Sequence, residues 1–325
     1  MEPLISIYGT VFNNANVIRK SINSVISKLP DFKKRFEMII VDNYSSDGTY
    51  EILKEYQKEY PNITVIQEKC TRGKGRAIAF NNTKGKYVLT IDFDTVYLEP
   101  FKNIVYSYKR IKSLEIYPMF MMRRETMDII GNWKDLNYDE DMELAANAIS
   151  KGIKVYSVLC AISQNQAIKN REKRYAAGYK YIKRQLKNYA DMISGGGLSL
   201  YDFISRYGND GKIKVALLYF LFRAIKPKNF RHNQKYNNRQ LVYNYSIYIS
   251  PKELKIKNEY WITEVYPYGK RPEDLMNKIY EFLSFGLDKT KLITHNSKSL
   301  LLLYHKKASK KLINDKISFF KTNVN

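Results

Sequence analysis

The sequence is poor in the residues that build disulfide frameworks, zinc sites and membrane spans. Only two cysteines, Cys70 and Cys160, and three histidines occur among 325 residues, and the cysteines lack metal-binding spacing. The apolar run 215–222 has eight residues, whereas a helix that crosses a bilayer needs about 20. The chain enters a strand-like segment at once, without the pattern of a signal peptide. We therefore expect reducing, cytoplasmic surroundings.

Acidic residues are also scarce, with 32 Asp and Glu against 55 Lys and Arg and a net charge of +23. Between residues 151 and 240, 19 basic residues stand against 4 acidic ones. Such a surplus fits an anionic membrane surface or a nucleic acid. The sequence shows no zinc-finger spacing, no aromatic box of the RRM type and no clear helix-turn-helix. Nucleic-acid binding is therefore kept as a remote alternative, and no nucleic-acid partner is expected.

Strand-like runs alternate with amphipathic helical stretches in the first half of the chain. Residues 3–14 and 37–53 contain β-branched runs that break into small polar turns, and an amphipathic helical stretch follows each turn. This rhythm predicts an α/β fold with helices around a largely parallel sheet, whose ligands lie beyond the carboxyl ends of the strands. The strand ends at 10–14, 42–49 and 92–94 are then expected to face one crevice.

Two carboxylates, Asp92 and Asp94, stand one residue apart in the run 85–100. Alternate side chains of a strand point the same way, so a D-x-D step directs both carboxylates to one point. Hard cations such as Mg²⁺ and Mn²⁺ prefer oxygen ligands and accept waters and substrate phosphates in their remaining positions. Taken alone, such a triplet is more often a pair of solvated turn residues, so the surrounding segments decide.

Four segments around the D-x-D stand in this order along the chain: ISIYGTVFNNANVIRKSINSVI, VDNYSSDGT, RGKGRAIAFNNTKGKYVLTIDFD, which contains the D-x-D, and IGNWKDLNYDEDMELAANAISKGIKV. Together they resemble the family 2 glycosyltransferases, over about residues 3–156. The resemblance implies an inverting enzyme with the GT-A fold, a mixed α/β sheet flanked by helices. It also implies a donor sugar linked to UDP or GDP and a divalent cation, Mn²⁺ or Mg²⁺.

The resemblance also implies where the donor and the metal bind. Asp42 matches the family's aspartate near the base and ribose. Asp94 is the expected primary metal ligand, and Asp92 is expected to contact the ribose, or the metal through water. The donor-binding residues predicted in this way are Thr10, Phe12, Asn13, Asp42, Asn43, Ser45, Gly73, Lys74, Arg76 and Asp92.

The letters RGKGR at 72–76 predict a compact basic loop. Its glycines would let backbone N–H groups approach an anion, with Lys74 and Arg76 as partners of the diphosphate. A solvated basic turn explains the same letters equally well.

The acceptor hydroxyl must lose a proton as it attacks, so a single-displacement enzyme needs a positioned carboxylate. Asp141, near the start of a predicted helix that runs to about residue 151, is the candidate general base. Glu140 and Trp133 are predicted on the acceptor side. The purely structural alternatives are that the acids at 139–141 only cap the helix and that Trp133 is a core residue.

The sequence departs from the family pattern in three ways. Asn43 replaces a second aspartate that many members have, and no histidine follows the Glu-Asp helix as a metal ligand. Only 47 positions separate Asp94 from Asp141, fewer than is usual in the family. The sequence therefore leaves the base and the acceptor open.

An alternative acceptor is a polyprenyl phosphate of the dolichyl type. RGKGRAIA and DMELAANAISKGIKV resemble the corresponding stretches of that subgroup. A phosphate acceptor is already ionised, and Asp141 would then orient a substrate. Against this, Val96 stands where related mannosyl-phosphate synthases carry a polar metal ligand.

The sequence predicts three segments. Residues 1–160 form the catalytic GT-A domain, and 161–235 form a basic helical region with a long amphipathic helix at 175–193. One expectation is that this region, with its apolar run 215–222, lies on the cytoplasmic face of the membrane. The alternative is that its helices are buried and its lysines are solvated. Residues 240–325 form a small α/β appendage of unknown role, with strands in 241–250, 254–268 and 299–305, a helix from Pro272 and a partly ordered basic tail at 306–325.

Overall fold

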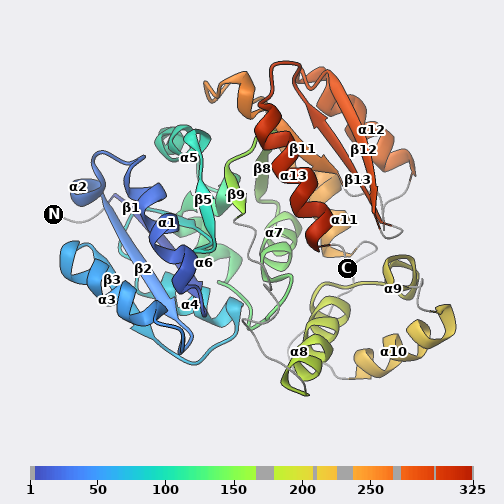
Figure 1. Cartoon of the computed structure of the whole chain (residues 1–325), viewed down its shortest axis with the longest axis horizontal. Helices are drawn as coiled ribbons and strands as arrows, with labels where there is room; N and C mark the ends of the chain where they lie inside the picture. The colour runs from blue at the N-terminus through green and yellow to red at the C-terminus, as the bar shows by residue number, and fades with distance from the viewer. Residues whose placement is uncertain are drawn as a thin grey trace.

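The structure, a computed structural model, describes residues 4–165, 179–207, 211–224, 237–265, 272–295 and 298–323. The elements of the first half surround a large sheet, the helices α8–α10 form a group at its lower right, and a small C-terminal sheet lies at the upper right (Figure 1). The predicted fold class, a mixed α/β sheet flanked by helices and followed by basic helices and a C-terminal α/β part, is confirmed.

The large sheet has eight strands in the order β10-β8-β6-β7-β4-β1-β2-β3. Its strands are β1 (Ile5–Val11), β2 (Phe36–Asp42), β3 (Ile63–Gln67), β4 (Tyr87–Thr90), β6 (Glu115–Tyr117), β7 (Met121–Arg123), β8 (Lys154–Val158) and β10 (Ile247–Ile249). The strands β3, β2, β1 and β4 run parallel, and β7 lies antiparallel between β4 and β6. The carboxyl ends of β1, β2 and β4 therefore share one edge.

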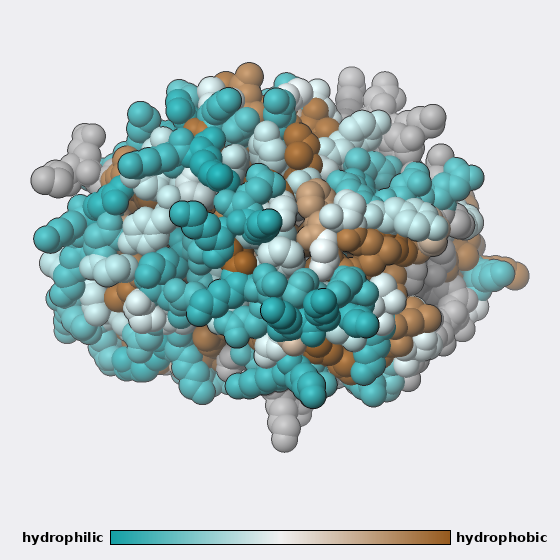
Figure 2. All heavy atoms as spheres, turned by 90° about the horizontal axis from the view of Figure 1, so that it is seen from above, coloured by the Kyte–Doolittle hydropathy of each residue, from teal (hydrophilic) through white to brown (hydrophobic). Residues whose placement is uncertain are grey.

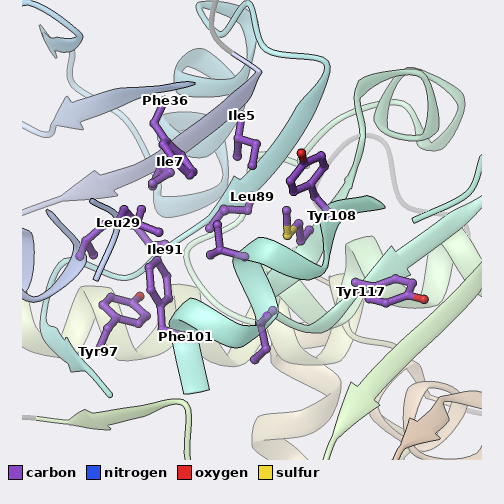
Figure 3. Packing of buried hydrophobic residues seen from close by; sticks show 14 of the residues in the cluster. Ile5, Ile7, Leu29, Phe36, Leu89, Ile91, Tyr97, Phe101, Tyr108 and Tyr117 are labelled. Atoms are coloured by element: carbon purple, nitrogen blue, oxygen red, sulfur yellow. The ribbon is translucent and has the colours of Figure 1, made fainter. Parts of the chain in front are cut away.

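Helices cover both faces of this sheet. They are α1 (Ala15–Ile26), α2 (Phe32–Arg35), α3 (Thr49–Glu59), α4 (Arg72–Asn81), α5 (Glu99–Val105), α6 (Arg124–Ile130) and α7 (Glu140–Ser150), with 3-10 turns at Tyr106–Arg110 and Pro118–Phe120. The sheet is buried on both sides, as its near-continuous apolar strands require. Figure 3 shows Ile5, Phe36, Leu89 and Phe101 meeting on one face, and Tyr8 belongs to the cluster on the other.

The predicted strand at 85–100 is interrupted. It consists of β4 and of β5 (Thr95–Tyr97), which pairs with β9 (Ser163–Asn165) in a separate two-stranded sheet. Asp92 and Asp94 lie in the connection between β4 and β5. The prediction that strand alternation directs their side chains is therefore wrong, because both residues follow the end of β4.

Apart from β9 at its start, the basic region is mainly helical where the structure describes it. It contains α8 (Tyr179–Ala190), the short π-helical turn Asp191–Gly195, α9 (Leu200–Tyr207) and α10 (Lys212–Ala224). The predicted amphipathic helix is confirmed from Tyr179 to Ala190, and its residues before 179 lie outside the described part of the chain. Met192, Phe203 and Phe222 belong to the apolar cluster that joins these helices.

The C-terminal segment contributes to both sheets. After α11 (Asn238–Tyr245), β10 pairs with β8 and so joins the large sheet. The remaining elements are β11 (Ile262–Val265), α12 (Pro272–Ser284), β12 (Lys289–His295), β13 (Lys298–Tyr304) and α13 (Lys310–Asn323), with a 3-10 turn at Asn258–Tyr260 and the sheet order β11-β13-β12.

Two expectations for this segment are wrong. Residues 241–245 are helical rather than a strand, because a capping box formed by Asn237 and Gln240 begins α11. The expected tail contains α13, whose Leu312 and Phe320 are buried against the small sheet. The helix predicted from Pro272 is confirmed.

The surface seen in Figure 2 is dominated by hydrophilic side chains, with hydrophobic residues gathered in small groups. In the described part of the chain, no helix combines the length and the apolar character that crossing a bilayer demands.

Candidate active site

The ends of β1, β2 and β4 are tied together by side chains that the sequence singled out. The backbone N–H of Asn13 donates to Ser45 Oγ at 2.9 Å, and Asn13 Oδ1 accepts from the backbone of Ser46 at 2.9 Å. Asn14 donates through its side chain to the carbonyl of Phe93, inside the D-x-D triplet. The three predicted strand ends therefore do face one another.

Asp42 is a fully buried carboxylate at the end of β2. It accepts hydrogen bonds from the backbone and hydroxyl of Ser45 and from Gln67 Nε2, the last at 3.1 Å. These contacts fix the turn after β2, since each would be lost if the turn moved. The next residue, Asn43, accepts from the backbone N–H of Cys70 at 2.9 Å and lies beside a cavity.

A cavity of about 80 Å³ lies beyond these strand ends. It is lined by Thr10, Val11, Phe12, Asn43, Cys70, Thr71, Arg72, Asn137 and Arg184. The sequence predicted Thr10, Phe12 and Asn43 as donor contacts, and the structure brings these three together. Arg184 comes from α8, and nothing in the local sequence of that helix indicates that it reaches this cavity.

Residues 72–76 are the first turn of α4, so the predicted loop is wrong. Thr71 caps the helix by accepting from the backbone of Lys74, and the N–H of Gly73 donates to the carbonyl of Leu136 at 2.8 Å. A Cβ on Gly73 would lie 1.9 Å from the carbonyl oxygen of Lys134. Gly73 therefore permits close packing between α4 and the segment before α7, and its N–H is not directed at an anion.

We expect Gly73→Ala to destabilise the protein by about 3 kcal/mol, because backbone rather than a movable side chain blocks the new methyl group. Lys74→Ala, at an exposed position of the same helical turn, is the matched control and should change stability little. Urea unfolding of both variants measures the difference. Equal stability of the two variants would contradict the close-packing role.

Arg76 joins the two acidic motifs of the sequence. Its guanidinium lies 2.7 Å from Asp92 Oδ1 and 2.8 Å from Glu140 Oε1, and both Arg76 and Glu140 are buried. Burial opposes the charge on Arg76, but the two carboxylates outweigh it and raise the pKa of the guanidinium. The D-x-D triplet and the start of α7 thus meet at one permanent cation.

Trp133 and Glu140 do not offer the acceptor-side surface that the sequence predicted. Trp133 is only 5% exposed, donates from Nε1 to the hydroxyl of Tyr8 at 3.0 Å and lies under the guanidinium of Arg76, 4.8 Å from its ring centre. Glu140 is 1% exposed and is also 3.5 Å from Arg72. Both residues hold Arg76 in place.

The remaining carboxylates are more accessible. Asp92 keeps 63% of its side-chain surface exposed, and the hydroxyl of Tyr97 binds both backbone groups of this residue. Asp94 and Asp141 are half-buried. Within the described ranges, no three His, Cys, Asp or Glu side chains gather into a ready-made metal site. The oxygen atoms of Asp92 and Asp94 are of the kind that Mg²⁺ and Mn²⁺ prefer.

Comparison with known proteins now adds the family. Residues 6–125 match glycosyl transferase family 2. The matched stretch runs from β1 to β7 of the large sheet. The resemblance predicted from the sequence motifs is confirmed over these residues, and the match includes the cavity residues on β1 and α4 as well as Asp92 and Asp94.

The matches to curated relatives cover only part of the chain and part of each relative. The chain is 33% identical over 93 residues to the poly(ribitol-phosphate) beta-glucosyltransferase of Bacillus spizizenii, which covers 28% of the chain and 14% of that protein. It is 32% identical over 95 residues to the putative teichuronic acid biosynthesis glycosyltransferase TuaG of Bacillus subtilis (29% and 36%). It is 29% identical over 97 residues to the dolichyl-phosphate beta-glucosyltransferase ALG5A of Trichomonas vaginalis (28% and 30%). The matched segment is thus well under half of each relative.

Among solved structures, the chain is similar to S. aureus TarS 1-349, with a TM-score of 0.43 and 16% identity over 71% of the chain and 94% of that structure. It is also similar to the mannosyltransferase PcManGT from Pyrobaculum calidifontis, with a TM-score of 0.45 and 13% identity over 70% and 77%.

The start of α7, which lies beyond the matched residues, is held by a residue from the C-terminal segment. Asp139, the left-handed residue that precedes α7 (φ 59°), is 4% exposed. Arg239 of α11 binds both of its carboxylate oxygens, from Nε to Oδ2 at 3.2 Å and from the terminal nitrogen to Oδ1. Asp141 lies two positions further along, in the first turn of the same helix.

Glu143 provides a pH-dependent test of the same helix. It is 5% exposed, and burial raises the pKa of its carboxyl from about 4.5 to about 7, although Lys134 and Lys151 oppose the shift. The folded protein therefore keeps a proton that the unfolded chain loses near pH 4.5. The stability contributed by Glu143 is complete below that pH and declines as the pH rises through about 7.

We expect Glu143→Gln to weaken the fall in the free energy of unfolding between about pH 5 and about pH 8, as measured in urea. Asp191, whose pKa burial raises to about 6, acts in the same direction and remains in the variant. A slope identical to that of the unmodified protein would show that Glu143 ionises normally in the folded state.

Proposed function

We propose that this chain is an inverting glycosyltransferase that moves a sugar from a UDP- or GDP-linked donor to an acceptor hydroxyl of a glycan, glycolipid or glycoprotein. The observation that carries the proposal is the contact of Arg76 with both Asp92 and Glu140. It brings the D-x-D triplet and the acidic start of α7 to one place, next to the cavity at the ends of β1 and β2.

The donor would enter that cavity. Thr10, Phe12 and Asn43 line it, and Asn13, Asp42 and Ser45 shape its wall by hydrogen bonds. In the proposal these residues bind the nucleotide, and Lys74, exposed on the first turn of α4, faces the diphosphate. Arg76 acts as the fixed positive charge behind Asp92 rather than as a mobile contact.

Asp94, with Asp92, would hold Mn²⁺ or Mg²⁺ together with the oxygen atoms of the diphosphate. Hard carboxylate oxygens in the connection that follows a buried strand suit such a cation. When bound, the cation neutralises negative charge on the leaving diphosphate. The protein itself adds Arg76, whose position is set before any ligand arrives because Glu140 and Trp133 hold it.

Asp141 is the proposed general base. It is half-buried in the first turn of α7, and one of its oxygens accepts from the backbone of Met142 at 2.8 Å. It would take the proton of the acceptor hydroxyl while the acceptor oxygen bonds to the anomeric carbon. The bond between that carbon and the diphosphate oxygen breaks on the opposite side, which inverts the configuration.

A polyprenyl phosphate is the second candidate acceptor. The observation in its favour is the group of basic helices α8–α10, one of which supplies Arg184 to the cavity. The proposal extends to a location on the cytoplasmic face of the membrane. A glycolipid acceptor and a polyprenyl phosphate acceptor would both be reached there. Because a phosphate is already ionised, this acceptor would not need Asp141 to remove a proton.

A thermal-shift and calorimetric screen with UDP, GDP and their common sugars, each with and without Mn²⁺ or Mg²⁺, tests the donor. A ligand that binds only the folded state raises the free energy of unfolding by about 2.7 kcal/mol at a concentration of about 100 Kd. We expect one nucleotide class to shift the protein in a metal-dependent way. A well-folded sample that responds to no nucleotide would refute the proposal.

A further inference from the structure

Helix α10 is apolar on both sides, but the structure buries only one of them. Val215, Tyr219 and Phe222 pack into the cluster formed with α8, α9 and the π-helical turn, and the Tyr219 hydroxyl donates to the carbonyl of Leu198 at 3.1 Å. The ring of Phe222 stacks 5.3 Å from that of Tyr189. The orientation of α10 is therefore fixed by its inner face.

The outer face carries large apolar side chains in solvent. Ile213 is 81% exposed, Leu217 67%, Phe220 60% and Leu221 56%. Their spacing at i, i+4, i+7 and i+8 places them in one stripe along the helix. We call these four residues the α10 stripe. A helix that is apolar all round is normally buried, so an exposed stripe of this size marks a surface that binds a partner.

The charges around the stripe identify the partner. Lys212, Lys214 and Arg223 lie on the same helix and are exposed. Within residues 179–207 and 211–224, the carboxylates are Asp191 and Asp202, and both are buried. The described surface of these helices thus presents apolar and basic groups without an exposed acid. That combination complements an anionic lipid surface, where apolar side chains enter the interface and basic ones meet the headgroups.

We propose that the α10 stripe docks this chain on an anionic bilayer, with α10 lying in the plane of the interface. The inference deepens the membrane location put forward with the proposed function. It places α8–α10 between the lipid and the rest of the molecule, at the edge where Figure 1 shows them. Arg184 of α8 then lies both at the donor cavity and in the docked unit.

Co-sedimentation of the full chain with vesicles tests the proposal. We expect at least about tenfold more binding to vesicles of phosphatidylcholine with phosphatidylglycerol than to phosphatidylcholine alone, and weaker binding in high salt. Phe220→Trp adds a reporter on the stripe, because Trp133 and Trp261 are both buried. Its emission should shift to the blue with the mixed vesicles.

The double variant Leu217→Glu with Phe220→Glu should lose binding by at least about tenfold. Leu292→Glu is the matched control, since Leu292 is 64% exposed on β12 outside the helical group. Replacing Lys212 and Lys214 by Gln should lower the preference for anionic vesicles by about fivefold for each charge.

Equal binding to neutral and anionic vesicles, or binding that survives the two glutamates, would overturn the proposal. So would a double variant that changes only the oligomeric state, because the stripe would then be a protein interface. Nucleotide binding, measured on the same samples by thermal shift, reports the proposed transferase site separately. Loss of vesicle binding with retained nucleotide binding therefore concerns the stripe alone.

Discussion

Asp141→Asn should lower the turnover of sugar transfer to a hydroxyl acceptor by about 10²-fold or more while leaving nucleotide binding intact. The amide keeps the size of the carboxylate but cannot accept the acceptor proton. The donor cavity is lined by other residues, so its affinity should not change. Release of UDP or GDP from the donor, followed with and without acceptor, measures the effect.

Glu143→Gln is the control for this substitution. It also replaces a carboxylate by an amide, two positions further along α7 and at a buried site. It should retain turnover. If Asp141→Asn also retained turnover, a base on Asp141 would be excluded, and an acceptor that is already ionised, such as a polyprenyl phosphate, would become the better explanation.

Asp94→Ala should abolish the metal-dependent part of nucleotide binding. Asp94 supplies the carboxylate that, in the proposal, holds the cation against the diphosphate, and the other acid of the triplet already contacts Arg76. The shift of the free energy of unfolding that a saturating nucleotide produces with Mn²⁺ or Mg²⁺, about 2.7 kcal/mol at about 100 Kd, should disappear. Calorimetry should show no metal-dependent heat.

Asp128→Ala removes an exposed carboxylate from α6 and is the matched control. It should bind nucleotide and metal as the unmodified protein does. If metal-dependent binding persisted in Asp94→Ala, other residues would have to be the ligands of the cation. Asp94 would then only form part of the turn before β5.

The strand pattern of the first half predicted the architecture because its signals are local. Alternation of apolar strands and amphipathic helices placed Asp42 and Asn13 correctly at the ends of parallel strands. The prediction succeeds at these positions because a polar residue at the end of a buried strand must find hydrogen-bond partners close by. The turn contacts of Asp42 with Ser45 are of that kind.

The failures arise where tertiary contacts decide. The glycines at 73 and 75 suggested a loop, but they allow a helix to pack against neighbouring backbone and side chains. Residues 241–245 alternate like a strand, yet a capping box before them begins a helix. Arg184 and Arg239 reach the site from distant helices, and no pattern in their own neighbourhood could indicate those contacts.

The contact between Arg239 and Asp139 bears on how the chain can be divided into fragments. A fragment that ended near residue 160 would contain the whole family match, but it would leave the buried carboxylate of Asp139 without its cation and expose the edge of β8 that β10 covers. An unpaired buried charge and an open sheet edge both favour misfolding and aggregation. The smallest fragment that keeps α7 in place therefore extends at least through β10, and a fragment made for crystallography should respect that limit.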